Sequence, residues 1–215
     1  MVPKTKNLNL KKRIIDIAYK HKLSHLSSYL TSVSIIDRIY SQMREDDIFI
    51  LSSGHCSLAL YVVLEKYKEK NAEELLLKHG GHPCHCEEDF LHCSTGSLGM
   101  GLTAAVGRAQ ANKDRDVFCL ISDGECAEGS IWESLKYIYE NNVTNIKVFV
   151  NINGHTAYNT IDEEYLSRRL RAFLPKISLH YTKVNTFSFL HGVNAHYHVM
   201  SEQDYQLALE RLRTE

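Results

Sequence analysis

Apolar residues along the chain follow two different spacings. Continuous apolar runs typical of buried strands occupy residues 48–51, 117–121 and 146–152, and the alternating segment 181–189 also favours a strand. Apolar residues spaced three or four positions apart predict helices over residues 10–18, 33–40, 58–67, 72–79, 102–111, 130–140, 162–173 and 201–212. Strands that alternate with helices in this way are typical of an α/β fold with a parallel sheet.

Composition and charge narrow the class of protein. The 215 residues are 44% hydrophobic and 24% charged, as in a globular domain with one sizeable core. Because the formal net charge is −1, we expect neither nucleic acid nor a membrane surface as a partner. No apolar run approaches the roughly 18 residues of a membrane span. The basic N-terminus lacks the apolar segment of a secretory signal, and six irregularly spaced cysteines indicate reduced thiols. We therefore expect a cytoplasmic protein.

Polar side chains follow two of the expected strands. Asp123 comes after the strand at 117–121, and Asn153 follows the strand at 146–152. Ligands bind at the carboxyl ends of parallel strands, and carboxylate, amide and carbonyl oxygens suit Mg²⁺ or Ca²⁺. Gly124 lets a phosphate approach the backbone closely. An ordinary strand-to-helix turn capped by Asp123 is the alternative interpretation, but Asn153 at the second strand end favours a ligand site.

Five segments resemble, in the same order, the motifs of the transketolase family. They are SHLSSYLTSVSIID, LSSGHCSLALY, HGGHP, STGSLGMGLTAAVG, and SDGECAEGSIWE followed by Asn-Gly after the next strand. Each motif is weak alone, but the ordered set over roughly residues 20–155 is specific, whereas residues 156–215 resemble the family weakly. Ser24 stands where the family has glycine.

The resemblance implies a role for each matching residue. The implied Mg²⁺ ligands are Asp123, Asn153 and the carbonyl of His155; thiamine diphosphate would contact His55, Gly96, Ser97, Leu98, Gly124 and Asn153; and the catalytic residues would be His25, His82, His196 and Glu128. Histidines suit proton transfer near neutral pH. Glu128 matches a glutamate of the network between two active sites, and His196 lies in an AHYH segment where the family has Trp-His.

The resemblance also implies an architecture and an activity. We expect one domain over residues 1–215: an α/β, three-layer parallel sheet flanked by helices with the thiamine-diphosphate-binding fold, shortened in its C-terminal part. The implied enzyme is a transketolase-type transferase that moves two-carbon ketol units between sugar phosphates. The chain would be the N-terminal subunit of a split transketolase, inactive alone. A C-terminal transketolase subunit would supply the glutamate that activates the cofactor, and two such pairs would form a dimer.

Two other functions remain open. Deoxyxylulose-phosphate synthases and the E1 subunits of 2-oxo acid dehydrogenases share this kind of cofactor site, although the wording of the GHxS, GSLGxG and EGSxWE motifs favours transketolase. A non-catalytic binding or regulatory module that keeps the fold is the second alternative. The shortened C-terminal part favours that module, whereas Asp123, Asn153 and the histidines at 25, 55 and 82 disfavour it.

A run of cysteines and histidines follows the HGGHP motif. It contains Cys84, His85, Cys86, His92 and Cys93. Two cysteines and two histidines, or three and one, can bind zinc tetrahedrally. Because Cys84 and Cys86 are closer in sequence than zinc ligands usually are, we expect free thiols here and keep the zinc site as the alternative.

Overall fold

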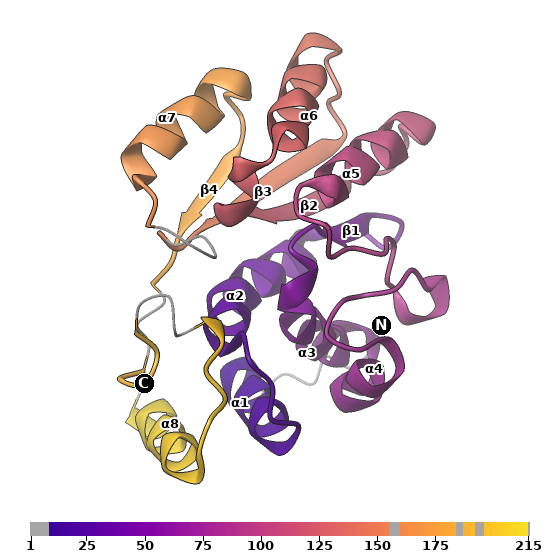
Figure 1. Ribbon diagram of the computed structural model, residues 1–215. Coiled ribbons are helices and arrows are strands. Elements are labelled where there is room, and N and C mark those ends of the chain that lie inside the picture. Colours follow the sequence, from indigo (N-terminus) through magenta and orange to yellow (C-terminus); the bar gives the residue numbers. More distant parts are fainter. Residues whose placement is uncertain (1–8, 155–159, 184–186, 192–195, 215) are drawn as a thin grey trace.

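A parallel sheet of four strands crosses the middle of the protein (Figure 1). The structure, a computed structural model, describes residues 9–154, 160–183, 187–191 and 196–214. In spatial order the strands are β1 (Ile48–Leu51), β2 (Val117–Ser122), β3 (Ile146–Ile152) and β4 (Ser178–Tyr181). Leu51 pairs with Leu120, Ser122 with Asn151 and Ile152 with Tyr181, so the carboxyl ends of the strands meet along one edge.

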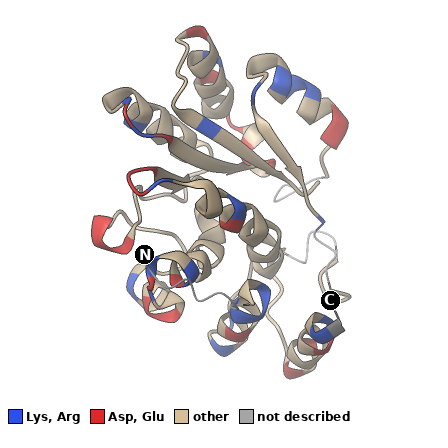
Figure 2. Ribbon diagram, turned by 180° about the vertical axis from the view of Figure 1, so that it is seen from behind, with Lys and Arg blue, Asp and Glu red and all other residues tan. Residues whose placement is uncertain are grey.

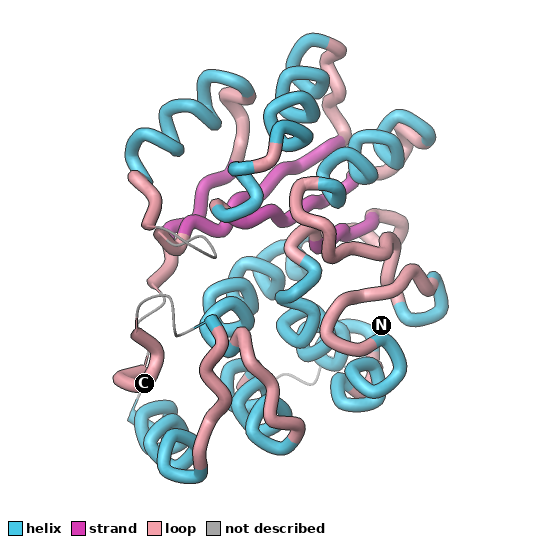
Figure 3. The backbone as a smooth tube through the Cα atoms, in the orientation of Figure 1, coloured by secondary structure: helices cyan, strands magenta, loops and turns pink. Residues whose placement is uncertain are grey.

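Helices cover both faces of this sheet. They are α1 (Leu10–Lys20), α2 (Leu26–Gln42), α3 (Ser57–Lys68), α4 (Ala72–His79), α5 (Met100–Ala111), α6 (Gly129–Glu140), α7 (Glu163–Phe173) and α8 (Glu202–Thr214), with short 3₁₀ turns η1 (Gly54–Cys56), η2 (Glu87–Asp89) and η3 (Gly124–Ala127). Helices α5, α6 and α7 lie on one side and α1 to α4 with α8 on the other (Figure 3). The predicted three-layer α/β class is confirmed.

Alternate side chains along the strands point to opposite faces of the sheet and belong to two separate hydrophobic cores. Phe49, Phe118 and Phe149 pack with α1 to α4, whereas Ile50 and Val150 pack with α5 to α7. Because both faces of the sheet are covered, the central strands are apolar throughout, which explains their continuous apolar runs. Charged residues belong mainly to the outer helices and the loops (Figure 2).

Side chains cap several helices as their sequences indicate. Asn71 accepts hydrogen bonds from the backbone N–H groups of Glu73 and Glu74 at the start of α4. Asp162 accepts from Tyr165 N–H at the start of α7.

Helix α8 packs on α1, where the rings of Tyr19 and Tyr205 stack with their centroids 4.3 Å apart.

The last strand differs from the expectation. The alternating segment 181–189 predicted a strand, but β4 covers Ser178–Tyr181 and shares only Tyr181 with that segment, of which residues 184–186 lie outside the described part of the chain. In the parts of the chain that the structure describes, no helix has the length and apolar character needed to cross a bilayer.

Candidate functional site

Asp123 connects the ends of β2 and β3. Its Oδ2 accepts hydrogen bonds from the backbone N–H groups of Asn153 and Gly154, both at 2.8 Å, and Oδ1 accepts one from Gly124 N–H at 3.0 Å. The side chain is 1% exposed. Burial raises the pKa of Asp123 to about 6, and the backbone hydrogen bonds oppose this rise. The two strand ends that the sequence singled out therefore meet at one buried carboxylate.

The turn after β3, whose N–H groups bind this carboxylate, contains Asn153 and lies against Glu163. Asn153 is half-buried, and Gly154 has a φ of +81°, a left-handed conformation that suits glycine. A Cβ on Gly154 would lie 2.7 Å from Oε1 of Glu163, which brings an exposed carboxylate of α7 to the same turn. No motif in the sequence had pointed to Glu163. His155, whose carbonyl is a predicted ligand, lies outside the described residues.

Glu125 is a second buried acid at this edge of the sheet, and it was assigned no role from the sequence. It is 0% exposed. Its Oε1 accepts hydrogen bonds from Ser52 Oγ at 2.6 Å and Gly99 N–H at 2.9 Å. Its Oε2 accepts from Ser122 N–H at 2.9 Å and Ser122 Oγ at 3.3 Å. Segments that are far apart in the sequence thus meet at Glu125.

Two loops approach each other closely beside β1. A Cβ on Gly54 would lie 2.6 Å from the carbonyl oxygen of Thr95, so only glycine fits without a shift of the backbone. Gly96 has a φ of +151°, and a Cβ there would lie 3.0 Å from Cδ2 of His82. The Thr95 hydroxyl donates to the carbonyl of Leu51 at 2.7 Å. The glycines therefore bring the predicted cofactor loop against both the start of η1 and the ring of His82.

Three of the predicted histidines form one group. The ring centroid of His25 lies 4.2 Å from that of His196 and 5.6 Å from that of His55. Burial is the main cause that lowers the pKa of His25 to about 4, and the neighbouring histidines at 196, 55 and 82 add to it. Burial also lowers the pKa of His55 and His196. At neutral pH these rings are uncharged, able both to donate and to accept hydrogen bonds.

Local backbone and side-chain contacts orient His25. The residue has a φ of +65° at the N-terminus of α2, a conformation that is costly for a residue with a side chain. Its N–H donates to the carbonyl of His196 at 2.9 Å. The hydroxyl of Ser24, at the motif position where glycine was expected, lies 2.8 Å from Nδ1 of His25. Ser24 is thus a polar neighbour of His25 that a glycine would not provide.

The remaining predicted residues lie on the surface of the same edge. Ser97, Leu98 and Glu128 are exposed, and Leu98 is 37% accessible. A Cβ on Gly99 would lie 2.9 Å from Cβ of Glu128, so Glu128 stands beside the turn that starts α5. The negative charge of Glu125 partly opposes the lowering of the pKa of His55 by burial. The structure thus gathers the described candidates at one end of the sheet.

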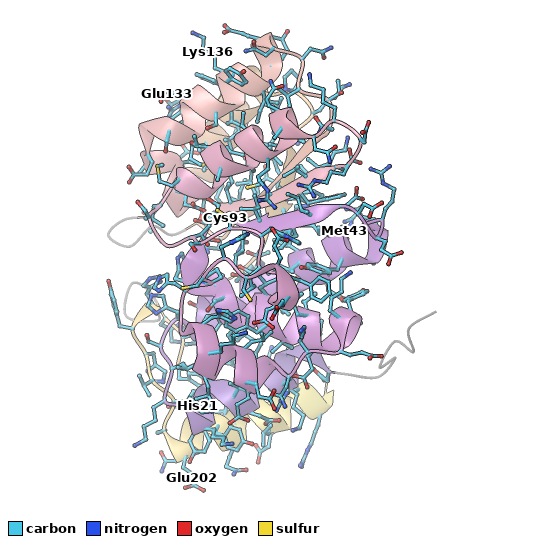
Figure 4. The ribbon with its side chains drawn as sticks, turned by 90° about the vertical axis from the view of Figure 1, so that its right-hand side faces the viewer. His21, Met43, Cys93, Glu133, Lys136 and Glu202 are labelled. Carbon is cyan, nitrogen blue, oxygen red and sulfur yellow. The ribbon has the colours of Figure 1, made fainter. Side chains whose placement is uncertain are left out.

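The residues of the possible zinc site do not come together. Among the described residues, ligand atoms of His79, Cys86 and Asp89 lie within 4.8 Å of one another, and only Cys86 belongs to the predicted set. Cys84 is exposed, Cys86 packs against the core on the α1 to α4 side, and Cys93 packs on the opposite side, next to the sheet (Figure 4). The predicted cysteines are therefore divided between two faces.

Ion pairs already fill the site around Asp89. Lys78 Nζ donates to its Oδ2 at 2.6 Å, Lys70 Nζ lies 3.3 Å from its Oδ1, and His79 Nε2 lies 2.7 Å from its Oδ2. A divalent cation would have to displace the Lys78 ammonium group, which also lies 3.9 Å from Sγ of Cys86. The geometry is that of an ion-pair network that fastens the loop after α4.

A groove of about 740 Å³ lies at the other end of the sheet. Its lining includes Phe118, Lys147, Phe149 and Lys176, with residues that precede β2, β3 and β4. In parallel sheets ligands bind at the carboxyl ends of the strands. We therefore assign the candidate site to the end that holds Asp123, and not to this groove.

Comparisons with known proteins agree on one family. A sequence profile for the transketolase thiamine diphosphate-binding domain matches residues 31–174. A subunit of the apulose-4-phosphate transketolase of Phocaeicola vulgatus is 30% identical over 173 residues, which cover 71% of this chain and 61% of that protein. Human transketolase is 35% identical over 119 residues, covering 50% of this chain and 19% of the human protein. The chain thus spans less than two thirds of the length of these relatives.

Solved structures share the fold. Transketolase from Leishmania mexicana matches with a TM-score of 0.70 and 17% identity, over 95% of this chain and 40% of that chain. A mutant transketolase from Pichia stipitis in complex with fructose 6-phosphate matches with a TM-score of 0.69 and 18% identity, over 100% of this chain and 40% of that chain. At such identity the likeness establishes the architecture alone.

Proposed function

The chain belongs to the transketolase family of thiamine diphosphate-binding domains, and we propose that it binds thiamine diphosphate together with Mg²⁺. The observation that carries the proposal is the position of Asp123, a buried carboxylate where the carboxyl ends of β2 and β3 meet. A carboxylate with so little exposure is costly unless it is paired or coordinates a metal. The match to transketolases favours this family over the related synthases and dehydrogenases.

The residues present fit the cofactor. Asp123 and Asn153 offer the hard oxygen atoms that Mg²⁺ prefers, and Mg²⁺ commonly bridges protein carboxylates to phosphate groups. The carbonyl of His155 is the proposed third ligand. Gly124 begins η3 next to Asp123 and has no side chain, so a phosphate group could approach the chain closely there. The segment from Gly96 to Leu98 would contact the cofactor rings, with Leu98 as the exposed apolar surface.

Proton transfer is the proposed task of the histidines. Thiamine diphosphate, when bound, supplies an electron sink for breaking and forming carbon–carbon bonds. His25 and His196 lie in ring contact and are neutral at pH 7, so each can accept a proton or hold a substrate hydroxyl. His82 packs against Gly96 at the same edge, and His55 is the proposed phosphate contact. Glu128 is the proposed contact to a second active site.

We propose that a second polypeptide completes the site. The Phocaeicola vulgatus relative is named as one subunit of its transketolase, which supports an enzyme built from more than one chain. The partner would be a C-terminal transketolase subunit that supplies the activating glutamate. The assembled pair, as a dimer of pairs, would transfer two-carbon ketol units between sugar phosphates.

Residues 1–215 would form one domain, because every described strand belongs to a single sheet.

Calorimetry tests the proposal on the chain with and without its candidate partner. We expect thiamine diphosphate to bind only when Mg²⁺ is present, and Asp123→Ala to abolish that binding. Glu133→Gln, an exposed position of α6, is the control and should bind as the wild type does. Binding of the cofactor by the Asp123→Ala protein would contradict the ligand assignment. An assembled pair that binds the cofactor without ketol transfer would favour a non-catalytic module.

A further inference from the structure

The carboxylate of Glu125 accepts about as many hydrogen bonds as a carboxylate can. Four hydrogen bonds of 2.6 to 3.3 Å reach its two oxygens, two at each, from the side chains of Ser52 and Ser122 and the backbone of Gly99 and Ser122. A carboxylate has about four acceptor positions. The side chain is fully buried, so water cannot replace any lost partner.

Each partner of Glu125 adjoins a segment of the candidate site. Ser52 follows β1 directly and precedes the turn that carries His55. Gly99 follows the loop that would line the cofactor. Ser122 immediately precedes Asp123. One carboxylate therefore ties together the three segments that carry the proposed cofactor contacts.

We propose that Glu125 is a positioning residue that fixes these three segments in the geometry needed for cofactor binding. The proposal rests on the proposed function. Glu125 has no exposed surface, so it acts through Ser52, Gly99 and Ser122 and touches neither cofactor nor substrate. Glu125 stands two residues after Asp123 and is buried within η3, whereas Gly124 between them is half-buried.

A carboxylate suits this position better than its amide analogue. The partners point N–H or O–H groups at Glu125, and a glutamine would turn its own NH₂ group toward some of them. Glu125→Gln thus keeps the volume of the side chain while it leaves donors without an acceptor. This variant separates the hydrogen bonds from the packing, which Glu125→Ala does not.

Asn145 is a matched control at the opposite end of the sheet. It precedes β3, is 9% exposed, and its side-chain amide donates to the carbonyls of Ala109, Asn112 and Arg115, each at 3.0 Å. Asn145→Ala therefore removes a buried hydrogen-bonding centre of similar size without touching the candidate site. A general loss of stability affects both variants, whereas loss of positioning affects only Glu125→Gln.

Amide hydrogen exchange on the 215-residue chain gives a readout that needs no cofactor. In Glu125→Gln we expect faster exchange at Gly99 and Ser122, relative to the amides in the middle of β3. In Asn145→Ala those two amides should keep the wild-type ratio. Unchanged exchange at Gly99 and Ser122 in Glu125→Gln would overturn the proposal. If that variant does not fold, Ser52→Ala removes one partner of Glu125 and should speed exchange at Gly99.

Titration with thiamine diphosphate and Mg²⁺ then measures the consequence for binding, with the partner chain where assembly requires it. We expect Glu125→Gln to raise the dissociation constant by about tenfold or more. Asn145→Ala should change the dissociation constant by less than about twofold, even where it loses as much unfolding free energy as Glu125→Gln or more. If both variants bind the cofactor equally weakly, Glu125 contributes only to the stability of the fold and the proposal fails. Absence of binding by the wild type would instead contradict the proposed function, and the exchange experiment would still decide whether Glu125 holds the three segments.

Discussion

The backbone N–H of His25 donates a hydrogen bond to the carbonyl oxygen of His196 at 2.9 Å, and the two rings lie 4.2 Å apart. This contact joins the start of α2 to a segment near the C-terminus of the chain. His55 belongs to the same group, with its ring 5.7 Å from that of His196. The arrangement sets the charge of the group, because protonation of one ring disfavours protonation of the next.

His25 is expected to titrate far below an ordinary histidine. Burial is the main cause that lowers its pKa to about 4, and the nearby ring of His196 adds to it. Nuclear magnetic resonance titration of the histidine ring signals measures this value directly. His196→Gln removes one neighbouring charge and should raise the pKa of His25. A pKa for His25 close to 6.5 in the wild type would contradict the observed packing of the three rings.

Acid should destabilise the fold through these histidines. Because the folded pKa of His25 lies below its unfolded value, the native state binds fewer protons than the unfolded state between about pH 4 and 6.5. Its contribution to stability is fully present above pH 6.5 and is lost as the pH falls toward 4. Urea unfolding of the wild type and His25→Gln at about pH 7 and about pH 5 measures the difference. The variant should lose less stability on acidification, and parallel losses would count against this assignment.

Asp123 should have the opposite pH dependence. Its folded pKa of about 6 lies above the unfolded value of 3.8, so the native state binds more protons between these values and the contribution of Asp123 falls as the pH rises. Asp123→Asn should therefore raise the free energy of unfolding at pH 7 by about 1–2 kcal/mol without Mg²⁺, after the cost of the lost hydrogen bond to Gly124.

The same variant gives a control within one measurement series. At about pH 4 the wild-type carboxyl is largely protonated, so Asp123→Asn should lose most of its advantage in stability. A variant that is less stable than the wild type at both pH values would show that the hydrogen bonds of Asp123 outweigh the cost of burying its charge.

Two glycines of α5 should respond in opposite ways to the same substitution. A Cβ on Gly101 would lie 2.5 Å from Cα of Ser52, so Gly101→Ala forces the helix away from the end of β1 and should cost about 1–3 kcal/mol. Gly107 is exposed, and a Cβ there would meet no neighbouring atom within 4 Å, so Gly107→Ala should stabilise by about 0.5–1 kcal/mol. Thermal unfolding compares them, and a stabilising Gly101→Ala would contradict the close packing of α5 on β1.

The strands that the sequence predicts well are those whose two faces are both buried. β1 and β3 have the predicted bounds because both faces of each strand are covered and their residues are mostly apolar. β4 lies at the edge of the sheet, is half-buried, and includes Ser178 and His180, so it carries little apolar signal. The alternating residues of 181–189 formed a stronger pattern, yet Phe187 is buried at a bend there.

Local motifs predicted the acid at the end of β2 but not the contacts between distant segments. Asp123 could be selected because a carboxylate after a buried strand is unusual. Glu125 was missed because its partners Ser52 and Gly99 stand 73 and 26 residues away in the sequence. The exposed acid Glu163 near Gly154 depends on how α7 packs, which no local pattern encodes.

The loop after α4 should be held by ion pairs rather than by zinc. Asp89 is buried and accepts from Lys78 and His79, so Asp89→Asn should lower the free energy of unfolding by about 1–3 kcal/mol. Glu88→Gln, at an exposed neighbouring acid, is the control and should change it by less than about 0.5 kcal/mol. Metal analysis of the purified chain should find no stoichiometric zinc. Zinc at one ion per chain that both Cys86→Ser and Asp89→Asn remove would show instead that a metal displaces the Lys78 ammonium group.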